Sequence, residues 1–237
     1  MGFIGYAAGA TLTDLTVCGE VEYTASGSGA GGLVGAVIYA DGKVTTLSNC
    51  VNEAIITANG GGNAGGMIGR STGNISIVGG SNGGTVNADA NYVGGAVGYI
   101  INSGENVPSL TITDFTNGGK IIGATGVGGV VGLIHSGTKA ATHALRYVKN
   151  TGEIVGENQV GGIVGVNYGS IENCKFSGNV IGDNEVGGIA GVNEETGEIR
   201  RCESNANVIG NHSAGGIVGN NHGILNNCSN SGSINTY

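Results

Sequence analysis

The residues that could do chemistry in this chain are few, and their spacing does not assemble a reaction centre. The four histidines are His135, His143, His212 and His222. None belongs to an HExxH sequence, the pair of zinc ligands with a glutamate on which many metallopeptidases depend. The chain has no GxSxG nucleophile motif, and Asp41, Asp89 and Asp114 stand at different points of the repeat described below. We therefore expect no catalytic residues and no enzyme activity.

The five cysteines, in contrast, follow the spacing of a repeat. Their number is odd and no CxxC pair is present, which argues against a disulfide framework or a zinc site. Aligned repeat units place Cys174 over three other cysteines and, with a short deletion, over a fourth. These are Cys50, Cys202, Cys228 and, with the deletion, Cys18; the remaining units hold Gly80, Phe115 and Val148. A position that accepts cysteine, valine or phenylalanine is an interior one, so we expect free, buried thiols. Adjacent disulfides such as Cys174 with Cys202 are within reach, but identical parallel strands seldom offer the required dihedral angle.

Acidic turns form a second candidate row. The pairs Glu157-Asn158, Asp183-Asn184 and Asn211-His212 precede successive glycine phrases. A row of oxygen ligands could hold calcium, but the acid is lost in the third unit and the GGxGxDxxx calcium repeat is absent. We interpret the row as solvated turns and expect neither a metal nor a cofactor.

Aromatic side chains are the third candidate, since their rings can stack on sugars. They are Tyr6, Tyr23, Tyr39, Tyr92, Tyr99, Tyr147, Tyr168 and Tyr237, and they do not share one slot of the repeat. Tyr92 and Tyr99 flank one glycine phrase beside an insertion at 101–108. Loops carry function more often than the elements they connect. We therefore expect ligand contacts first at this insertion and at 137–142.

The element that must position these residues is a short repeat. Two glycines, two apolar residues and a glycine recur from Gly31, Gly65, Gly94, Gly128, Gly161, Gly187 and Gly215, after a clipped copy at Gly2 to Gly5. Each unit is too short for a core of its own and must stack on its neighbours. The unit at 161–186 holds three β-branched patches between glycine and asparagine, which is typical of short strands joined by tight turns.

The sequence therefore predicts an all-β fold, a parallel β-helix or β-solenoid of about eight coils with roughly three short strands per coil. Right-handed crossover is the rule for parallel strands. The phrase recurs from end to end, so we expect one domain over residues 1–237, as a piece of a larger protein. Ile171 and Cys174 point inward only if the chain bends at Glu172-Asn173.

Polar rows should accompany the apolar ones. The alignment superposes Arg146, Glu172 and Arg200, and beside them Lys149, Lys175 and Glu203. Exposed ion pairs of this kind contribute about 0.2 to 1 kcal/mol each. Asparagines precede the cysteine slot (Asn49, Asn173, Asn227) and follow the glycine phrase (Asn167, Asn193, Asn220). Asparagine tolerates the left-handed conformation and can stack its amides along an array.

Composition limits the partners. A net charge of -8 and a pI near 4.8 argue against binding to nucleic acid or to an anionic membrane surface. No apolar run is long enough to span a membrane, and no signal peptide follows Met1. With 51 glycines, one proline and 39% hydrophobic residues, the chain has the apolar content of a packed protein.

The last three units, which begin GGIVGVNYGSIENC, GGIAGVNEETGEIRRC and GGIVGNNHGILNNC, resemble the GLUG motif. The earlier units resemble it more loosely. The resemblance implies a bacterial cell-surface or secreted protein, often adhesin-like, and such repeats also occur in IgA1-specific metallopeptidases. It implies a non-catalytic stalk or ligand-presenting module whose partners are a host or matrix protein or glycan and the flanking domains. The alternative is an accessory region of a secreted peptidase or a polysaccharide-active β-helix enzyme.

Overall fold

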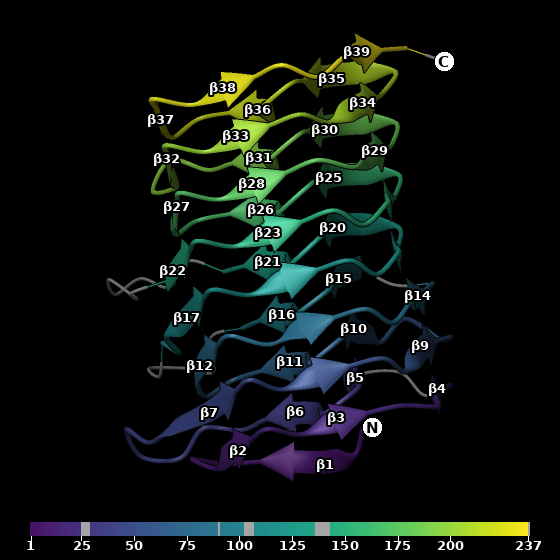
Figure 1. Cartoon of the computed structure of the whole chain (residues 1–237), viewed down its shortest axis with the longest axis vertical. Helices are drawn as coiled ribbons and strands as arrows, with labels where there is room; N and C mark the ends of the chain where they lie inside the picture. Colours follow the sequence, from purple (N-terminus) through teal and green to yellow (C-terminus); the bar gives the residue numbers. More distant parts are fainter. Residues whose placement is uncertain (25–28, 90, 102–106, 136–142, 237) are drawn as a thin grey trace.

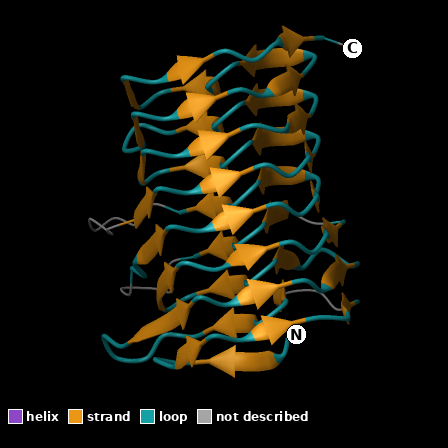
Figure 2. Ribbon diagram, viewed as in Figure 1, coloured by secondary structure: helices purple, strands orange, loops and turns teal. Residues whose placement is uncertain are grey.

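A computed structural model describes residues 1–24, 29–89, 91–101, 107–135 and 143–236. Within these ranges the chain forms 39 strands and no helix (Figure 2). The strands are two to five residues long, because glycine, asparagine, aspartate and serine interrupt every β-branched run. None of the described residues forms a helix that could span a membrane.

The strands stack into five parallel sheets, which we call A to E in the order in which the chain visits them (Figure 1). Sheet A contains β1 (Ile4–Ala7), β6 (Val34–Val37), β11 (Ile68–Ser71), β16 (Val97–Ile100), β21 (Val131–Ile134), β26 (Val164–Asn167), β31 (Ala190–Asn193) and β36 (Val218–Asn221). Sheet B contains β2 (Thr11–Thr13), β7 (Val44–Ser48), β12 (Asn74–Val78), β17 (Leu110–Thr113), β22 (His143–Arg146), β27 (Ser170–Glu172), β32 (Glu198–Arg200) and β37 (Ile224–Asn226).

The other three sheets complete each coil. Sheet C contains β3 (Thr16–Val17), β8 (Val51–Asn52), β13 (Ser81–Asn82), β18 (Thr116–Asn117), β23 (Lys149–Asn150), β28 (Lys175–Phe176), β33 (Glu203–Ser204) and β38 (Ser229–Asn230). Sheet D contains β4 (Glu20–Tyr23), β9 (Ile55–Ala58), β14 (Val86–Ala88), β19 (Ile121–Ile122), β24 (Ile154–Val155), β29 (Asn179–Ile181), β34 (Asn207–Ile209) and β39 (Ile234–Asn235). Sheet E contains β5 (Gly29–Gly31), β10 (Asn63–Gly65), β15 (Asn91–Gly94), β20 (Thr125–Gly128), β25 (Asn158–Gly161), β30 (Asn184–Gly187) and β35 (His212–Gly215).

The predicted parallel β-solenoid is confirmed. Sheets A to D each have eight described strands and sheet E has seven, which gives seven coils of five strands and a last coil of four. The near strands β28, β33 and β38 run to the right as the chain climbs from the N-terminal to the C-terminal end, so the coil is right-handed (Figure 1). Successive coils lie one strand spacing apart, about 4.8 Å.

The expectation of three strands per coil is wrong, since each full coil has five. Two of the five strands lack the run of apolar residues by which a strand is recognised in the sequence. Strands of sheet C are two residues long in every coil, and strands of sheet E end in glycine, which the sequence pattern treats as punctuation. These positions require glycine, because the neighbouring backbones approach too closely to leave room for a side chain. A Cβ atom at Gly128 would lie 2.7 Å from the backbone nitrogen of Gly165 in the next coil.

The core is a slim column of stacked small side chains. In the coil at 161–186, Ile163, Val164, Ile171, Cys174 and Val180 are all fully buried. Asn173 adopts a φ of 54°, and this left-handed residue makes the bend that lets both Ile171 and Cys174 point inward. The predicted corner at Glu172-Asn173 is therefore confirmed.

Candidate functional site

The cysteine ladder lies in the interior, as predicted. The pairing of sheet C aligns Cys50 with Gly80, Phe115, Val148, Cys174, Cys202 and Cys228 in successive coils. Cys50, Cys174 and Cys202 are at most 1% exposed, while Cys228 in the last coil is half-buried. All five thiols are free. The pKa of the Cys202 thiol is raised to about 12, mainly by its hydrogen bond with the Cys174 thiol and further by burial.

The placement of Cys18 in this ladder is wrong. Thr16 pairs with Val51, so Leu15 lies beneath Cys50 and Cys18 lies three residues beyond the slot. The Cys18 thiol is exposed and donates a hydrogen bond to Glu53 (Sγ to Oε2, 3.4 Å). This hydrogen bond, with lesser effects of burial and of the Glu53 charge, raises the pKa of the Cys18 thiol.

Thiol labelling of the native chain should therefore separate the cysteines. We expect Cys18 to react readily, Cys228 slowly and the three buried thiols only on unfolding, because thiolates react and buried thiols rarely ionise. Glu53→Gln should move the pH dependence of Cys18 labelling to lower pH, since the group that raises its pKa is neutralised. Stopped alkylation with peptide mass analysis measures each site. Rapid native labelling of Cys174 or Cys202 would contradict the interior ladder.

Asparagines form hydrogen-bonded ladders along the coils. Asn167 donates to Asn193, and Asn193 to Asn221, with Nδ2 to Oδ1 distances of 2.8 Å. The third member is thus Asn221 and not Asn220, because Val192 pairs with Asn220. Asn49, Asn173 and Asn227 have φ values of 51° to 54°, which confirms the predicted left-handed turns.

A second asparagine ladder went unpredicted although the sequence carries its signal. Asn52, Asn82, Asn117 and Asn150 each stand two residues after the cysteine slot. They are fully buried and joined amide to amide over 2.7 to 2.8 Å. The ladder stops where the next coil has Phe176, and the Asn150 amide donates instead to the Gly162 carbonyl oxygen at 2.5 Å. These amides satisfy one another, so they are structural groups and not an open site.

The charged rows keep the predicted register, with partly different ion pairs. Arg146 bonds to Glu172 (Nε to Oε2, 3.3 Å), and Lys175 bonds to Glu203 (Nζ to Oε2, 2.8 Å). Arg200, however, pairs with Glu198 on its own strand, and Arg201 takes the other oxygen of Glu172. All of these groups are at the surface, where such pairs contribute little to stability.

The candidate metal ligands belong to different segments of the coil. His212 lies in β35 and His222 follows β36. In the acidic row, Asn184 donates to Asn158 and Asn211 to Asp183, both over 2.8 Å, so these turns satisfy themselves. Across the described ranges, no three histidine, cysteine, aspartate or glutamate side chains gather as a metal-binding group. The carboxylates Asp41, Asp89 and Asp114 lie in the A–B, D–E and B–C connections respectively.

The outer faces of sheets A and E meet along one strip of the surface, which we call the outer A–E strip. Its sheet A row is Tyr6, Ala36, Arg70, Tyr99, Leu133, Val166, Val192 and Asn220. Its sheet E row is Asn63, Tyr92, Gly126, Gln159, Glu185 and Ser213. The rows face each other, since Asn220 donates to Glu185 (Nδ2 to Oε1, 2.8 Å) and Tyr92 stacks on Tyr99.

Tyrosines concentrate on this strip. The Tyr92 and Tyr99 ring centroids are 4.6 Å apart at an interplanar angle of 27°. With Tyr168 these rings pack on Leu133, Val166 and Val192, a second apolar cluster separate from the core. Tyr6 and Tyr99 share one register row, so the expectation that tyrosines share no slot is wrong for this pair. Both follow the closing glycine of their phrase, which is the signal that would have found the row.

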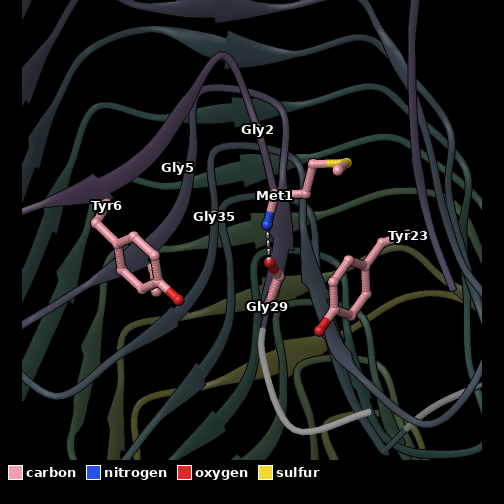
Figure 3. Close-up of a pocket in the computed structure, with 8 residues that line it drawn as sticks. Met1, Gly2, Gly5, Tyr6, Tyr23, Gly29 and Gly35 are labelled. Carbon is pink, nitrogen blue, oxygen red and sulfur yellow. Dashed lines mark hydrogen bonds between the residues drawn. The ribbon is translucent and has the colours of Figure 1, made fainter. Parts of the chain in front are cut away.

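A pocket of about 290 Å³ lies at the N-terminal end of the strip (Figure 3). Tyr6 and Tyr23 stand on its two sides and direct their hydroxyls toward the space between them. The floor is backbone: a Cβ at Gly29 would lie 2.6 Å from the carbonyl oxygen of Gly35. The Met1 ammonium group donates to the carbonyl oxygen of Gly29 at 2.6 Å, and Ala36 completes the lining.

Two loops were expected to contact a ligand first. The loop at 137–142 lies entirely outside the described residues, and so do residues 102–106 of the insertion at 101–108. The structure does describe Tyr92 and Tyr99, which were predicted to lie beside the insertion.

Fold and surface together define a parallel β-solenoid repeat protein. Residues 156–181 match the GLUG motif, which confirms the resemblance drawn from the repeat. A solved structure of a candidate immunoglobulin A1 protease from Bacteroides ovatus is similar in fold. The TM-score is 0.58 at 17% identity, over 92% of this chain and 76% of that protein. A comparison with curated proteins gives no match.

Proposed function

We propose that this chain is a non-catalytic repeat segment of a bacterial cell-surface or secreted protein, acting as a stalk or ligand-presenting module. The observation that carries the proposal is the unbroken stack. All five sheets run in register through the coils with parallel hydrogen-bonded neighbours, and an array of this kind holds its surface rows at fixed spacing. The GLUG motif at 156–181 supports the bacterial extracellular assignment.

The chemistry of the described residues supports a binding role over catalysis. Among the described residues, Glu172 and Glu203 are paired with arginine and lysine, and the buried asparagines Asn82, Asn117 and Asn150 are bonded to one another. A glycosidase requires two carboxyl groups across one bond, and a lyase requires a placed base. The proposed partners are a host or matrix protein or glycan, together with flanking domains of the parent protein.

A second candidate is an accessory region of a secreted peptidase. Its support is the GLUG resemblance and the fold shared with a candidate immunoglobulin A1 protease. In that role the chain still binds and does not cleave.

A screen of the purified chain against immobilised host and matrix proteins and glycans, run beside depolymerase and peptidase assays, tests the proposal. We expect saturable binding with no turnover. Cleavage of a substrate by the folded chain, but not by the heat-unfolded chain, would contradict the non-catalytic function. A lack of binding to every protein and glycan tested would contradict ligand presentation.

A further inference from the structure

His143 lies in the interior of the solenoid, at a position that the register of sheet B determines. The inner row of this sheet contains Thr45, Ile75, Leu110, His143 and Gly169 in successive coils. The first three are at most 1% exposed, and His143 is 5% exposed. Gly169 leaves room for the imidazole, since a Cβ there would lie 2.6 Å from the Cβ of His143. The strand pairing therefore directs an ionisable side chain into an apolar column.

The imidazole of His143 is neutral and has its proton on Nε2. This atom lies 3.1 Å from the carbonyl oxygen of His135, and a carbonyl oxygen only accepts hydrogen bonds. Nδ1 therefore has a free lone pair, and it is buried with no hydrogen-bond partner among the described residues. Protonation of Nδ1 would place a positive charge and an unpaired N–H in the interior, which is costly without an acceptor or a counter-charge.

The strands that pack on β22 provide no counter-charge for His143. These strands are β17 and β27. Strand β17 has no titratable side chain. In β27, Glu172 lies at the other end of the strand, opposite Arg146, to which it is bonded. Within the described part of the chain, a charged His143 would therefore face apolar and uncharged groups from both neighbouring coils.

The titratable group next to His143 is a second imidazole. His135 follows β21, and its Nδ1 is also buried without a partner in the described structure. Its ring stacks on Tyr168 with the centroids 6.2 Å apart, and Tyr168 in turn interacts with Glu194. A proton on His135 would repel one on His143, so this neighbour also disfavours the charged form.

The direction of the acid response follows from these contacts. Burial lowers the pKa of His143 from the ordinary value of 6.5; the hydrogen bond to the His135 carbonyl oxygen opposes this shift, and charge on the His135 ring adds to it. The unfolded chain takes up this proton near pH 6.5, whereas the folded chain does so only at lower pH. The folded state therefore loses stability as the pH falls below 6.5, until the lowered pKa is reached.

We propose that His143 makes the fold sensitive to acid: its neutral imidazole joins the start of β22 to the end of β21, and its protonation releases the start of β22 from the core. Both strands belong to the fifth of the eight coils, so the release occurs within the stack and not at its ends. This response belongs to the fold and does not depend on the ligand that the chain presents.

Urea unfolding of the whole chain at about pH 7.5 and about pH 5.5 tests the proposal, because ordinary aspartates and glutamates stay ionised over this range. We expect the folding equilibrium constant to fall several-fold between the two, and at most about tenfold per pH unit for one proton. His143→Gln should abolish this fall, since its amide stays neutral and can still donate to the His135 carbonyl oxygen. Hydrogen exchange, corrected for its intrinsic pH dependence, should show β22 losing protection at the lower pH in the original chain alone.

His212→Gln is the matched control, since His212 is an exposed histidine in β35, and it should keep the full acid response. An equal fall in the original chain and in His143→Gln would overturn the proposal. If glutamine prevents folding, NMR of nitrogen-labelled histidines in the original chain decides. A folded-state His143 that stays neutral below about pH 6.5, with its proton on Nε2, would support the proposal, whereas ordinary titration or a proton on Nδ1 would contradict it.

Discussion

Gly161→Val is expected to prevent stable folding of the chain. A Cβ at Gly161 would overlap the carbonyl oxygen of Val164 and lie 2.7 Å from the backbone nitrogen of Gly191 in the next coil. Both atoms belong to backbone that is held in place by neighbouring coils, so neither can move aside. We expect the free energy of unfolding to fall by more than about 4 kcal/mol, because the surrounding backbone cannot relax to accommodate the added atoms. Urea unfolding followed by circular dichroism measures it.

Gly83→Ala is the matched control. The nearest atom to a Cβ there is the carbonyl oxygen of Asn52 at 3.9 Å, and the residue is exposed. We expect its free energy of unfolding to stay within about 0.5 kcal/mol of that of the original chain, as for other surface substitutions. Equal stability of the two variants would show that coils do not approach as closely at Gly161 as the structure places them.

Asn117→Leu should have the next largest effect. The Asn117 side chain is fully buried, accepts from Asn82 and donates to Asn150, each over 2.8 Å, and donates to the Gly119 carbonyl oxygen at 3.0 Å. Leucine has a similar volume but leaves one N–H of the buried Asn82 amide unpaired, although the same nitrogen still donates to Gly84. It also leaves the buried Asn150 oxygen with the Gly152 N–H alone and removes the donor to the Gly119 carbonyl oxygen. An unsatisfied buried polar group costs about 1 to 3 kcal/mol, so we expect a loss of roughly 2 to 4 kcal/mol.

The exposed pair Asn158 and Asn184 provides the comparison, because it has the same amide-to-amide distance of 2.8 Å. Asn184→Ala should change the free energy of unfolding by less than about 0.5 kcal/mol, since water replaces the lost hydrogen bond. Chemical denaturation of both variants under one set of conditions gives the two values. If Asn117→Leu lowers the free energy of unfolding no more than Asn184→Ala does, the buried asparagine ladder does not stabilise the fold.

The period of the repeat and the interior slots were predictable from sequence, since only buried positions exchange cysteine, valine and phenylalanine. The left-handed B–C corner was predictable where asparagine occupies it. Tyr147 and Arg201 adopt the same conformation, with φ of 55° and 50°, and their residue types give no such signal. Stacking of the neighbouring coils determines the conformation at these two positions.

The sequence also contains a signal for the correct slot in the first coil that the alignment of the repeats missed. Asp14-Leu15 matches Asp114-Phe115, and both aspartates are left-handed corner residues. This match would have placed Leu15, and not Cys18, in the slot. The pocket was beyond sequence reasoning, because it depends on the distance between Tyr6 and Tyr23 across two different sheets.

Strands that lie across the long axis determine how the molecule would respond to tension. The two termini are at opposite ends of the stack (Figure 1), so a pull between them loads the ladder hydrogen bonds one coil at a time, as in peeling, and not all at once as in shear. Each released coil frees 26 to 35 residues, or roughly 90 to 120 Å of extended chain. Under load such a tether would lengthen stepwise and limit the force that reaches whatever is bound to it.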